Sequence, residues 1–180
     1  AIKSAIKKGG EINNFKPIDP NINGPYKDKI KRNLIHGYFA SISYMDAQMG
    51  RLMSEIKRLK LDENTVIVLW GDHGWHLGDH GQWAKHSNFE QATRSPLIIV
   101  DPDTKSNNFS SSPVEFIDVF PTLCDLSNIE IPELLDGISL RPQILGQGVS
   151  SKIFAVSQYP RHGSIMGYSF RTKSHRYTVW

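Results

Sequence analysis

The sequence predicts an α/β fold, with part of a sheet flanked by helices and a small antiparallel β subdomain after it. From residue 29 to residue 60, apolar side chains recur at spacings of three and four, which is typical of an amphipathic helix. The runs VIVLW (66–70) and LIIV (97–100) are short, apolar and rich in β-branched residues, as in strands buried on both faces of a parallel sheet. A helix that leads into such a strand is half of an α/β unit.

The chain divides into three parts by composition. Residues 1–28 are rich in Asn, Pro and Gly as well as Lys, and they predict an extended basic lead-in. Residues 29–150 contain the helix, the two strands and a further helix, for which Ser112 is the expected N-cap and Pro113 the first residue. Residues 151–180 contain a strand candidate, IFAVSQYP, and an alternating stretch, GYSFRTKSHRYTVW, which together predict the small antiparallel β subdomain.

Composition and charge exclude two classes of partner. The net charge is +3, but residues 1–32 hold eight Lys and Arg against three Asp and Glu, which leaves the remainder at −2. This basic segment has no series of aromatic stacking residues and no recognition helix, so we expect no nucleic-acid binding. The apolar runs are far shorter than the roughly 20 residues of a membrane-spanning helix, so we expect no membrane insertion. No signal peptide is visible, so the sequence start does not indicate a compartment.

Asp72 and His73 directly follow the first predicted strand, inside the sequence GDHG. Open α/β sheets bind ligands beyond the carboxyl ends of their strands, which favours a functional role for this position. A carboxylate oxygen and an imidazole nitrogen can ligate one metal ion or two neighbouring ions. The alternative is a capping aspartate beside a surface histidine. The buried strand and the flanking glycines, Gly71 and Gly74, leave the two interpretations about equally supported.

The loop that follows supplies a cation and two tryptophans. Beside a metal ion, Lys85 can hold an anionic ester oxygen and stabilise the charge that develops there, whereas alone it is a surface lysine. Trp75 and Trp83 either wall a sugar pocket or cover the loop's own core. The residue types in this loop therefore suit an anionic, sugar-like ligand without proving one.

The loop histidines do not predict a self-contained zinc site. The spacing of His73, His76 and His80 suits zinc ligands on a helix, but the intervening glycines argue against a helix, and no cysteine partners are nearby. We expect His80 to line a pocket, and His76 and His86 to be loop residues. Cys124, the sole cysteine, lies in the apolar stretch FPTLCDLS, which predicts a buried, unreactive thiol. The motifs GxSxG, GxxxxGK[ST] and HExxH do not occur. The sequence therefore does not predict a serine hydrolase, an NTPase or a metalloprotease of the kinds that carry them.

The segment GDHGWHLGDHGQWAKHSNFEQATRSPLIIV resembles the second metal-binding segment of sulfatases in the alkaline phosphatase superfamily, in particular that of the iduronate-2-sulfatases. GYFASISYMDAQMGRLMSEIKRL is similar to the helix before that segment, and VEFIDVFPTLCDLSNIEIP to the helix after it. SQYPR and MGYSFRTKSHRYTVW resemble the carboxyl-terminal subdomain. The resemblance implies that residues 29–150 are the later part of an alkaline-phosphatase-like α/β catalytic domain, and that residues 151–180 begin the subdomain after it.

The resemblance also implies roles for the matching residues. Asp72 and His73 correspond to metal ligands, and the metal in most sulfatases is calcium. Lys85 corresponds to the lysine that contacts the sulfate ester. Trp75 and His80 are the loop candidates for substrate binding. Arg161 is a third, in place of a lysine that iduronate sulfatases carry in a longer loop.

The nucleophile of the sulfatases is absent from these 180 residues. Sulfatases attack with a formylglycine made from the Cys or Ser of a C-x-P-S-R-type motif, whereas Cys124 is followed by Asp-Leu-Ser-Asn. We therefore expect a sulfuric ester hydrolase of sulfated carbohydrates whose nucleophile lies on an amino-terminal half, and we expect this chain alone to be inactive. The resemblance implies a periplasmic or secreted protein in a bacterium and a lysosomal one in a eukaryote. The alternatives are a phosphate or phosphonate ester hydrolase of the same superfamily and a non-catalytic module that binds sulfated glycans.

Overall fold

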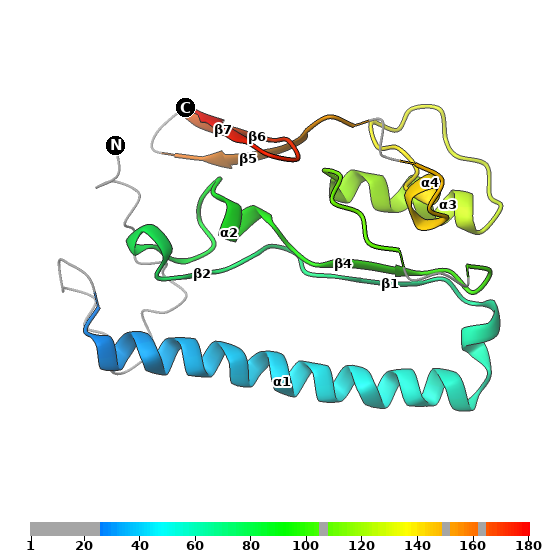
Figure 1. Cartoon of the computed structure of the whole chain (residues 1–180), viewed down its shortest axis with the longest axis horizontal. Helices are drawn as coiled ribbons and strands as arrows, with labels where there is room; N and C mark the ends of the chain where they lie inside the picture. The colour runs from blue at the N-terminus through cyan, green and yellow to red at the C-terminus, as the bar shows by residue number, and fades with distance from the viewer. Residues whose placement is uncertain (1–25, 105–107, 149–151, 162–164) are drawn as a thin grey trace. The chain divides into compact units, whose positions relative to one another are not determined.

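A computed structural model describes residues 26–104, 108–148, 152–161 and 165–180. The chain separates into two compact units, residues 1–60 with 71–95, and residues 61–70 with 96–180. Figure 1 labels most of the helices and strands of both. The basic lead-in expected over residues 1–28 lies, up to residue 25, outside the described residues. The boundaries expected at residues 28 and 150 stay predictions.

The first unit contains the long helix α1, Asp28–Arg58, which confirms the amphipathic helix predicted from the spacing of apolar residues. Asp28 lies in its first turn, and Lys57 and Arg58 lie in its last turn. These charges complement the positive amino end and the negative carboxyl end of the helix dipole.

The core of the first unit lies where the first turns of α1 meet the loop of residues 71–95. Tyr26 and Trp83 are buried there, with ring centroids 5.6 Å apart. The apolar residues packed against them are Ile30, Leu34, Ile35 and Leu77. Trp83 therefore covers the loop's own core, which was one of the two roles open to it. Further along α1 the apolar side chains are exposed, among them Phe39, Ile42, Met45 and Leu52.

Residues 71–95 fold into a short hairpin and single helical turns. Strand β2, His76–Leu77, pairs antiparallel with strand β3, Trp83–Ala84, and the 3-10 helix η3, Asp79–Gly81, lies between them. Gly78 has a φ of 108°, which favours glycine over other residues. The loop ends with α2, Glu90–Thr93. His76 lies in a strand and His80 in a 3-10 turn, so these histidines do not share one α-helix, as the intervening glycines predicted.

The second unit begins with the 3-10 helix η2, Leu61–Asn64, and contains both strands predicted from the apolar runs. Strand β1, Ile67–Trp70, pairs with β4, Leu97–Val100, in antiparallel register. The expectation of a parallel, doubly buried arrangement for these two strands is wrong. Their side chains are half-buried or exposed, and Trp70 retains 50% of its accessible surface. An apolar run encodes the tendency to form a strand but not the direction of the neighbouring strand.

The helix predicted after β4 begins later than its sequence indicated. A 3-10 turn, η4 (Phe116–Asp118), leads into α3, Val119–Leu126. Glu115 caps this segment and forms a reciprocal capping box with Asp118, so the expected N-cap at Ser112 is wrong. Cys124 is buried in α3, as predicted. A further short helix, α4, follows at Arg141–Ile144.

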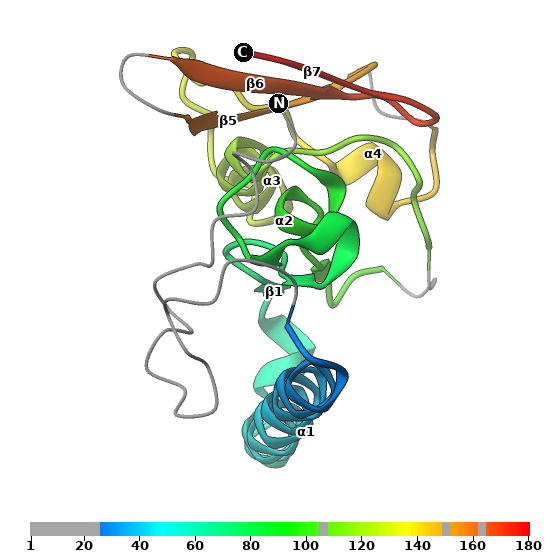
Figure 2. The ribbon, with the colours of Figure 1, turned by 90° about the vertical axis from the view of Figure 1, so that its left-hand side faces the viewer.

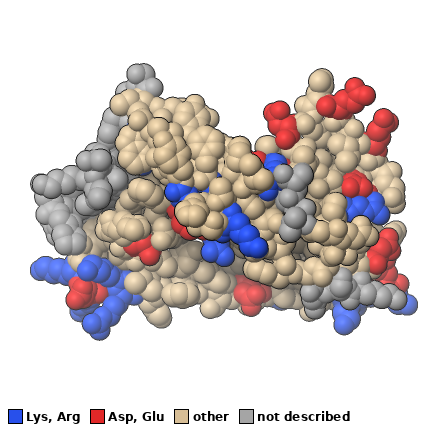
Figure 3. Space-filling model, turned by 45° about the horizontal axis from the view of Figure 1, so that its top comes forward, with Lys and Arg blue, Asp and Glu red and all other residues tan. Residues whose placement is uncertain are grey.

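The last part of the second unit is a three-stranded antiparallel sheet, which confirms the predicted β subdomain. Its strands are β5, Ala155–Pro160, β6, Met166–Arg171, and β7, Arg176–Val179, in the order β5-β6-β7. Figure 2 shows the three strands in one sheet. On the face drawn in Figure 3, Asp and Glu side chains lie beside Lys and Arg side chains in several places. Among the residues that the structure describes, no helix combines the length and apolar character needed to cross a bilayer.

Candidate active site

The turn that carries Asp72 and His73 is hydrogen-bonded at both ends to residues in or just after α2. The Ser95 hydroxyl donates to the Gly71 carbonyl, and the Gly74 N–H donates to the Ala92 carbonyl at 2.8 Å. Gly74 has no room for a side chain, because an added Cβ would lie 2.0 Å from the backbone carbonyl oxygen of Gln91. Gly74 therefore allows the close approach of the two backbone segments that holds the turn in place.

Within this turn, Asp72 and His73 face each other. The Asp72 Oδ2 and His73 Nε2 atoms are 3.3 Å apart, and the His73 backbone N–H donates to Asp72 Oδ1 at 3.1 Å. The Asp72 side chain is 84% exposed and that of His73 is 28% exposed. His73 Nδ1 lies 2.8 Å from the Gly74 carbonyl oxygen. Since a carbonyl only accepts, Nδ1 carries a proton in this contact, and a neutral ring then has its lone pair on Nε2, towards Asp72.

This pair fits a metal ion as a partial set of ligands. Histidines that bind metals commonly donate their other ring N–H to a backbone carbonyl, which fixes the tautomer, and His73 makes that contact with Gly74. The Asp72 carboxylate adds an oxygen ligand on the same side. No group of three or more His, Cys, Asp or Glu side chains gathers in a metal-binding arrangement within the described ranges. Further ligands would have to come from elsewhere.

Trp75 lies against aromatic neighbours in the first unit. Its ring stacks on Tyr38 of α1, with centroids 6.5 Å apart and planes at 22°, and on His73, with centroids 6.1 Å apart and planes at 29°. These contacts give Trp75 a supporting role beside the candidate ligand His73. A role in stacking on a sugar stays a prediction.

Lys85 follows strand β3 in a tightly turned segment. Ala84, directly before it, is fully buried and has a φ of 67°, and the Ser87 N–H donates to the Lys85 carbonyl at 2.8 Å. Lys85 itself is half-buried. The backbone on both sides of this lysine is therefore held by named contacts.

The burial of His76 was not predicted from the sequence. It was expected to be an ordinary loop residue, but it is only 1% exposed, and its Nε2 lies 2.7 Å from the Ser87 hydroxyl. Burial lowers the pKa of His76, an effect that the charge of Asp79 opposes and the charge of His80 reinforces. No pattern in the sequence marks His76 as buried, because it lies in a two-residue strand that carries little periodic signal.

The two other candidates for substrate binding lie apart in the chain. His80 is exposed, has a φ of 54°, and its ring centroid lies 5.9 Å from that of Phe89. Arg161, in the second unit, follows β5, and its guanidinium carbon lies 4.8 Å from the ring centroid of Trp180. The Arg161 Nε is buried, and it has no hydrogen-bond partner among the residues that the structure describes. Substrate binding by His80 and Arg161 stays a prediction.

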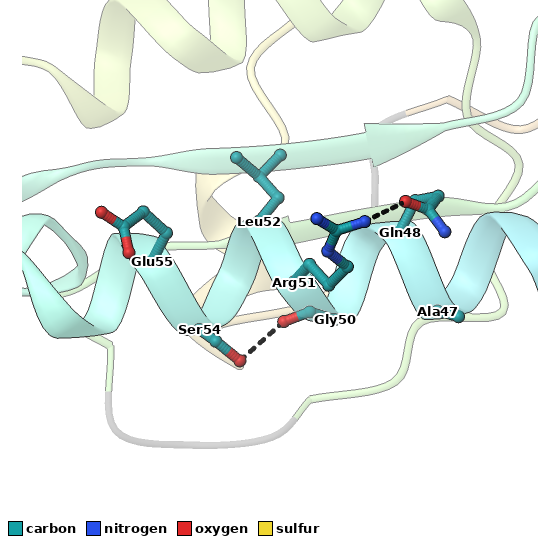
Figure 4. A pocket seen from close by; sticks show the side chains of 7 residues that line it. All are labelled: Ala47, Gln48, Gly50, Arg51, Leu52, Ser54 and Glu55. Carbon is teal, nitrogen blue, oxygen red and sulfur yellow. Dashed lines mark hydrogen bonds between the residues drawn. The ribbon is translucent and has the colours of Figure 1, made fainter.

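A shallow surface hollow runs along one side of α1 (Figure 4). All of its lining residues belong to that helix: Ala47, Gln48, Gly50, Arg51, Leu52, Ser54 and Glu55. Arg51 donates to the Gln48 side chain and Ser54 donates to the Gly50 carbonyl, so its polar groups are engaged within the helix. One helix face cannot enclose a ligand, and we assign no chemistry to it.

Comparisons with known proteins agree with the resemblance seen in the sequence. The family model described as Sulfatase matches residues 10–129. Human iduronate 2-sulfatase is 32% identical over an alignment of 217 positions, gaps included, that covers 87% of this chain and 40% of that protein. The chain thus spans about two fifths of the length of this relative.

Two solved structures show the same fold. The phosphonate monoester hydrolase of Silicibacter pomeroyi has a TM-score of 0.78 at 24% identity, covering 97% of this chain and 39% of that one. A protein solved in complex with its substrate, D-glucosamine-2-N,6-O-disulfate, has a TM-score of 0.70 at 26% identity, covering 94% of this chain and 36% of that one. The α/β architecture is thus of the alkaline-phosphatase-like kind, and with two thirds of its residues matched by the family model, the chain belongs to the sulfatase family.

Proposed function

We propose that this chain supplies part of the active site of a sulfuric ester hydrolase that acts on a sulfated carbohydrate. The observation that carries the proposal is the Asp72–His73 pair, in which the Gly74 carbonyl fixes the His73 ring and directs Nε2 towards the Asp72 carboxylate. Asp72 and His73 bind a divalent metal ion, which we propose to be calcium. Lys85 binds the sulfate group.

The chain's own residues bind and orient the ester. When bound, the metal ion supplies positive charge that polarises an ester oxygen. The Lys85 ammonium adds a second positive charge for the sulfate oxygens, which is worth most where charge develops in the transition state. Calcium prefers oxygen ligands, so Asp72 is the stronger ligand of the pair, and His73 also orients that carboxylate.

The nucleophile of this reaction comes from another part of the protein. Cys124 is buried in α3 and followed by Asp125, which is not the setting of a residue converted to formylglycine. We propose that an amino-terminal half provides the formylglycine and the remaining metal ligands, and that these 180 residues alone do not turn over. As a sulfatase of glycans, the protein would work in a periplasmic, secreted or lysosomal setting. The names of two similar proteins, which refer to iduronate and to a disulfated glucosamine, support a sulfated sugar as the substrate class. Trp75, His80 and Arg161 are the proposed contacts to that sugar.

A phosphonate or phosphate ester hydrolase is the second candidate, because the fold of a phosphonate monoester hydrolase superposes on 97% of the chain. Both substrates are tetrahedral oxyanion esters that a metal ion and a lysine can hold. A non-catalytic module that binds sulfated glycans is a third, and it differs in needing no metal. The proposed sulfatase therefore has to show both sulfate release and metal dependence.

The test uses the protein that carries this chain together with its proposed amino-terminal half. Hydrolysis of 4-nitrophenyl sulfate, 4-nitrophenyl phosphate and a sulfated disaccharide is measured with and without chelator, alongside D72N, H73A and K85M. The expected result is calcium-dependent sulfate release that each substitution reduces by at least about 100-fold. The exposed lysine in the last turn of α1 gives the matched control, K57M, which should leave the rate unchanged. Preference for the phosphate ester would favour the second candidate, and metal-independent glycan binding without turnover would favour the third.

A further inference from the structure

We propose that His76 is a positioning residue for Lys85, and that its buried ring fixes, through Ser87, the short segment from which the Lys85 ammonium reaches the ester. This inference rests on the proposed function, because it requires that Lys85 bind the anionic group. It assigns a role to a residue that neither ligates the metal nor contacts the substrate.

The first step is the backbone pairing of His76. His76 lies on β2 directly opposite Ala84 of β3, the residue before Lys85. Both are almost wholly buried, with 1% exposure for His76 and none for Ala84. Ala84 also has a left-handed φ of 67°, an uncommon backbone conformation for a residue with a side chain, which turns the chain at this point. The amino-terminal side of Lys85 is thus set by the strand that carries His76.

The second step is the side chain of His76. Its Nε2 lies 2.7 Å from the Ser87 hydroxyl, and that hydroxyl also accepts the Phe89 N–H at 3.2 Å. The Ser87 N–H in turn donates to the Lys85 carbonyl at 2.8 Å. The carboxyl-terminal side of Lys85 is thus set by the ring of the same histidine.

The third step follows from the first two. Lys85 lies between Ala84 and Ser87, and both are tied to His76, one through the backbone and one through the imidazole ring. A lysine side chain is long and flexible, so its placement depends on where its backbone is fixed. Catalytic groups lose much of their effect when displaced by about 1 Å, so a loosened segment lowers activity even though Lys85 itself remains.

The substitutions that test this inference separate hydrogen bonding from packing. H76Q places an amide near the position of Nε2 and can still bond Ser87, whereas H76L has similar bulk and no polar group. S87A removes the partner and leaves the ring, and it serves as a second variant if H76L fails to fold. We expect H76L and S87A to lower kcat/KM for the sulfate ester by about 10- to 100-fold. H76Q should restore most of that loss.

A double-mutant cycle with K85M shows whether His76 acts through Lys85. If it does, H76L in the K85M background causes no further loss, because the group it positions is already gone. Hydrogen exchange on the whole protein, with its amino-terminal half, gives a readout independent of activity. In H76L, the amides of residues 85–89 should exchange faster while those of β5–β7 are unchanged.

The outcomes distinguish failure of this inference from failure of the proposed function. If K85M keeps native activity, Lys85 does not bind the ester, and the proposed function is wrong in that respect. If K85M is inactive but H76L is not, or if the losses from H76L and K85M add independently, His76 does not position Lys85. Failure of H76Q to restore activity in a folded protein would also overturn the inference.

Discussion

Gly74 determines where the candidate ligands Asp72 and His73 can lie, because its backbone touches that of Gln91. A methyl group at this position would meet the Gln91 carbonyl oxygen at 2.0 Å, and a backbone atom cannot swing aside. We expect G74A to lower the free energy of unfolding by about 1–3 kcal/mol, since overpacking forces the backbone to move. Urea unfolding followed by circular dichroism measures this. In α1, Gly50 has nothing within 4 Å of an added Cβ, so G50A should instead stabilise by about 0.5–1 kcal/mol.

A second residue-scale prediction concerns pH. Burial lowers the pKa of His76 in the folded state, so between that value and the unfolded value of about 6.5 the unfolded chain binds more protons. Stability therefore rises with pH across this window: the contribution is fully present above about pH 6.5 and is lost as pH falls through the folded pKa. Urea unfolding at a series of pH values should show this slope in the native chain and a smaller one in H76Q. Equal slopes in the two proteins would show that His76 is not the group responsible.

Among the elements, the start of α3 is joined to the start of the carboxyl-terminal sheet by a buried ionic cluster. Lys152 donates to the carboxylates of Glu115 and Asp118, and Glu115 also accepts the backbone N–H of Val156 in β5. Asp118 has no exposed surface and also accepts the Ile138 N–H at 3.0 Å. Burial alone would lower the pKa of Lys152, but the hydrogen bonds and charges of the two carboxylates raise it.

Removing the cation from this cluster should destabilise the second unit. K152M leaves two carboxylates without their counter-charge, one of them fully buried, and we expect a loss of about 3 kcal/mol in the free energy of unfolding. Chemical unfolding monitored by circular dichroism gives the value. K173M, at the exposed turn between β6 and β7, is the control and should change stability little. A similar small change in K152M would mean that the cluster contributes nothing net.

The elements also show which features a sequence can predict. The bounds of α1 were predictable to within two residues because apolar spacing and terminal charges agree over 31 residues. The β6–β7 hairpin was predictable from alternation, whereas the antiparallel pairing of β1 with β4 was not, because direction depends on partners far away in the chain. The N-cap was misplaced at Ser112 because Ser112 and Pro113 match the usual start of a helix, whereas Glu is not a usual N-cap residue. The reciprocal hydrogen bonds of Glu115 and Asp118 set the actual start.

The sequence predicted the pair of candidate ligands, but not the buried contacts that hold the neighbouring loop. Asp72 and His73 are consecutive residues, so their side chains are close together whatever the tertiary structure. The bond between His76 and Ser87 spans eleven residues and depends on a two-residue hairpin that carries little periodic signal. Tertiary contacts of this kind decide which polar residue is buried, and sequence spacing alone does not encode them.

At the scale of the whole molecule, many large apolar side chains of the described residues are exposed to solvent. The apolar face of α1 is exposed over Phe39, Ile42, Met45 and Leu52, and in the second unit Trp70 of β1 and Ile98 of β4 are at least half exposed. Contiguous exposed apolar patches usually mark surfaces that another polypeptide covers. The proposed amino-terminal half is the polypeptide that would cover them.

The final prediction follows from this surface. The isolated chain should bind the dye ANS strongly and self-associate in sedimentation velocity, and both effects should decline when the amino-terminal half is co-expressed. In the isolated chain, I42E with M45E should reduce dye binding, because both side chains are exposed on the apolar face of α1 and charges there make that face hydrophilic. Gln48, an exposed polar residue of the hollow on α1, provides the matched control, and Q48E should leave dye binding unchanged. A native chain that sediments as a monomer without binding the dye would show that this face needs no partner.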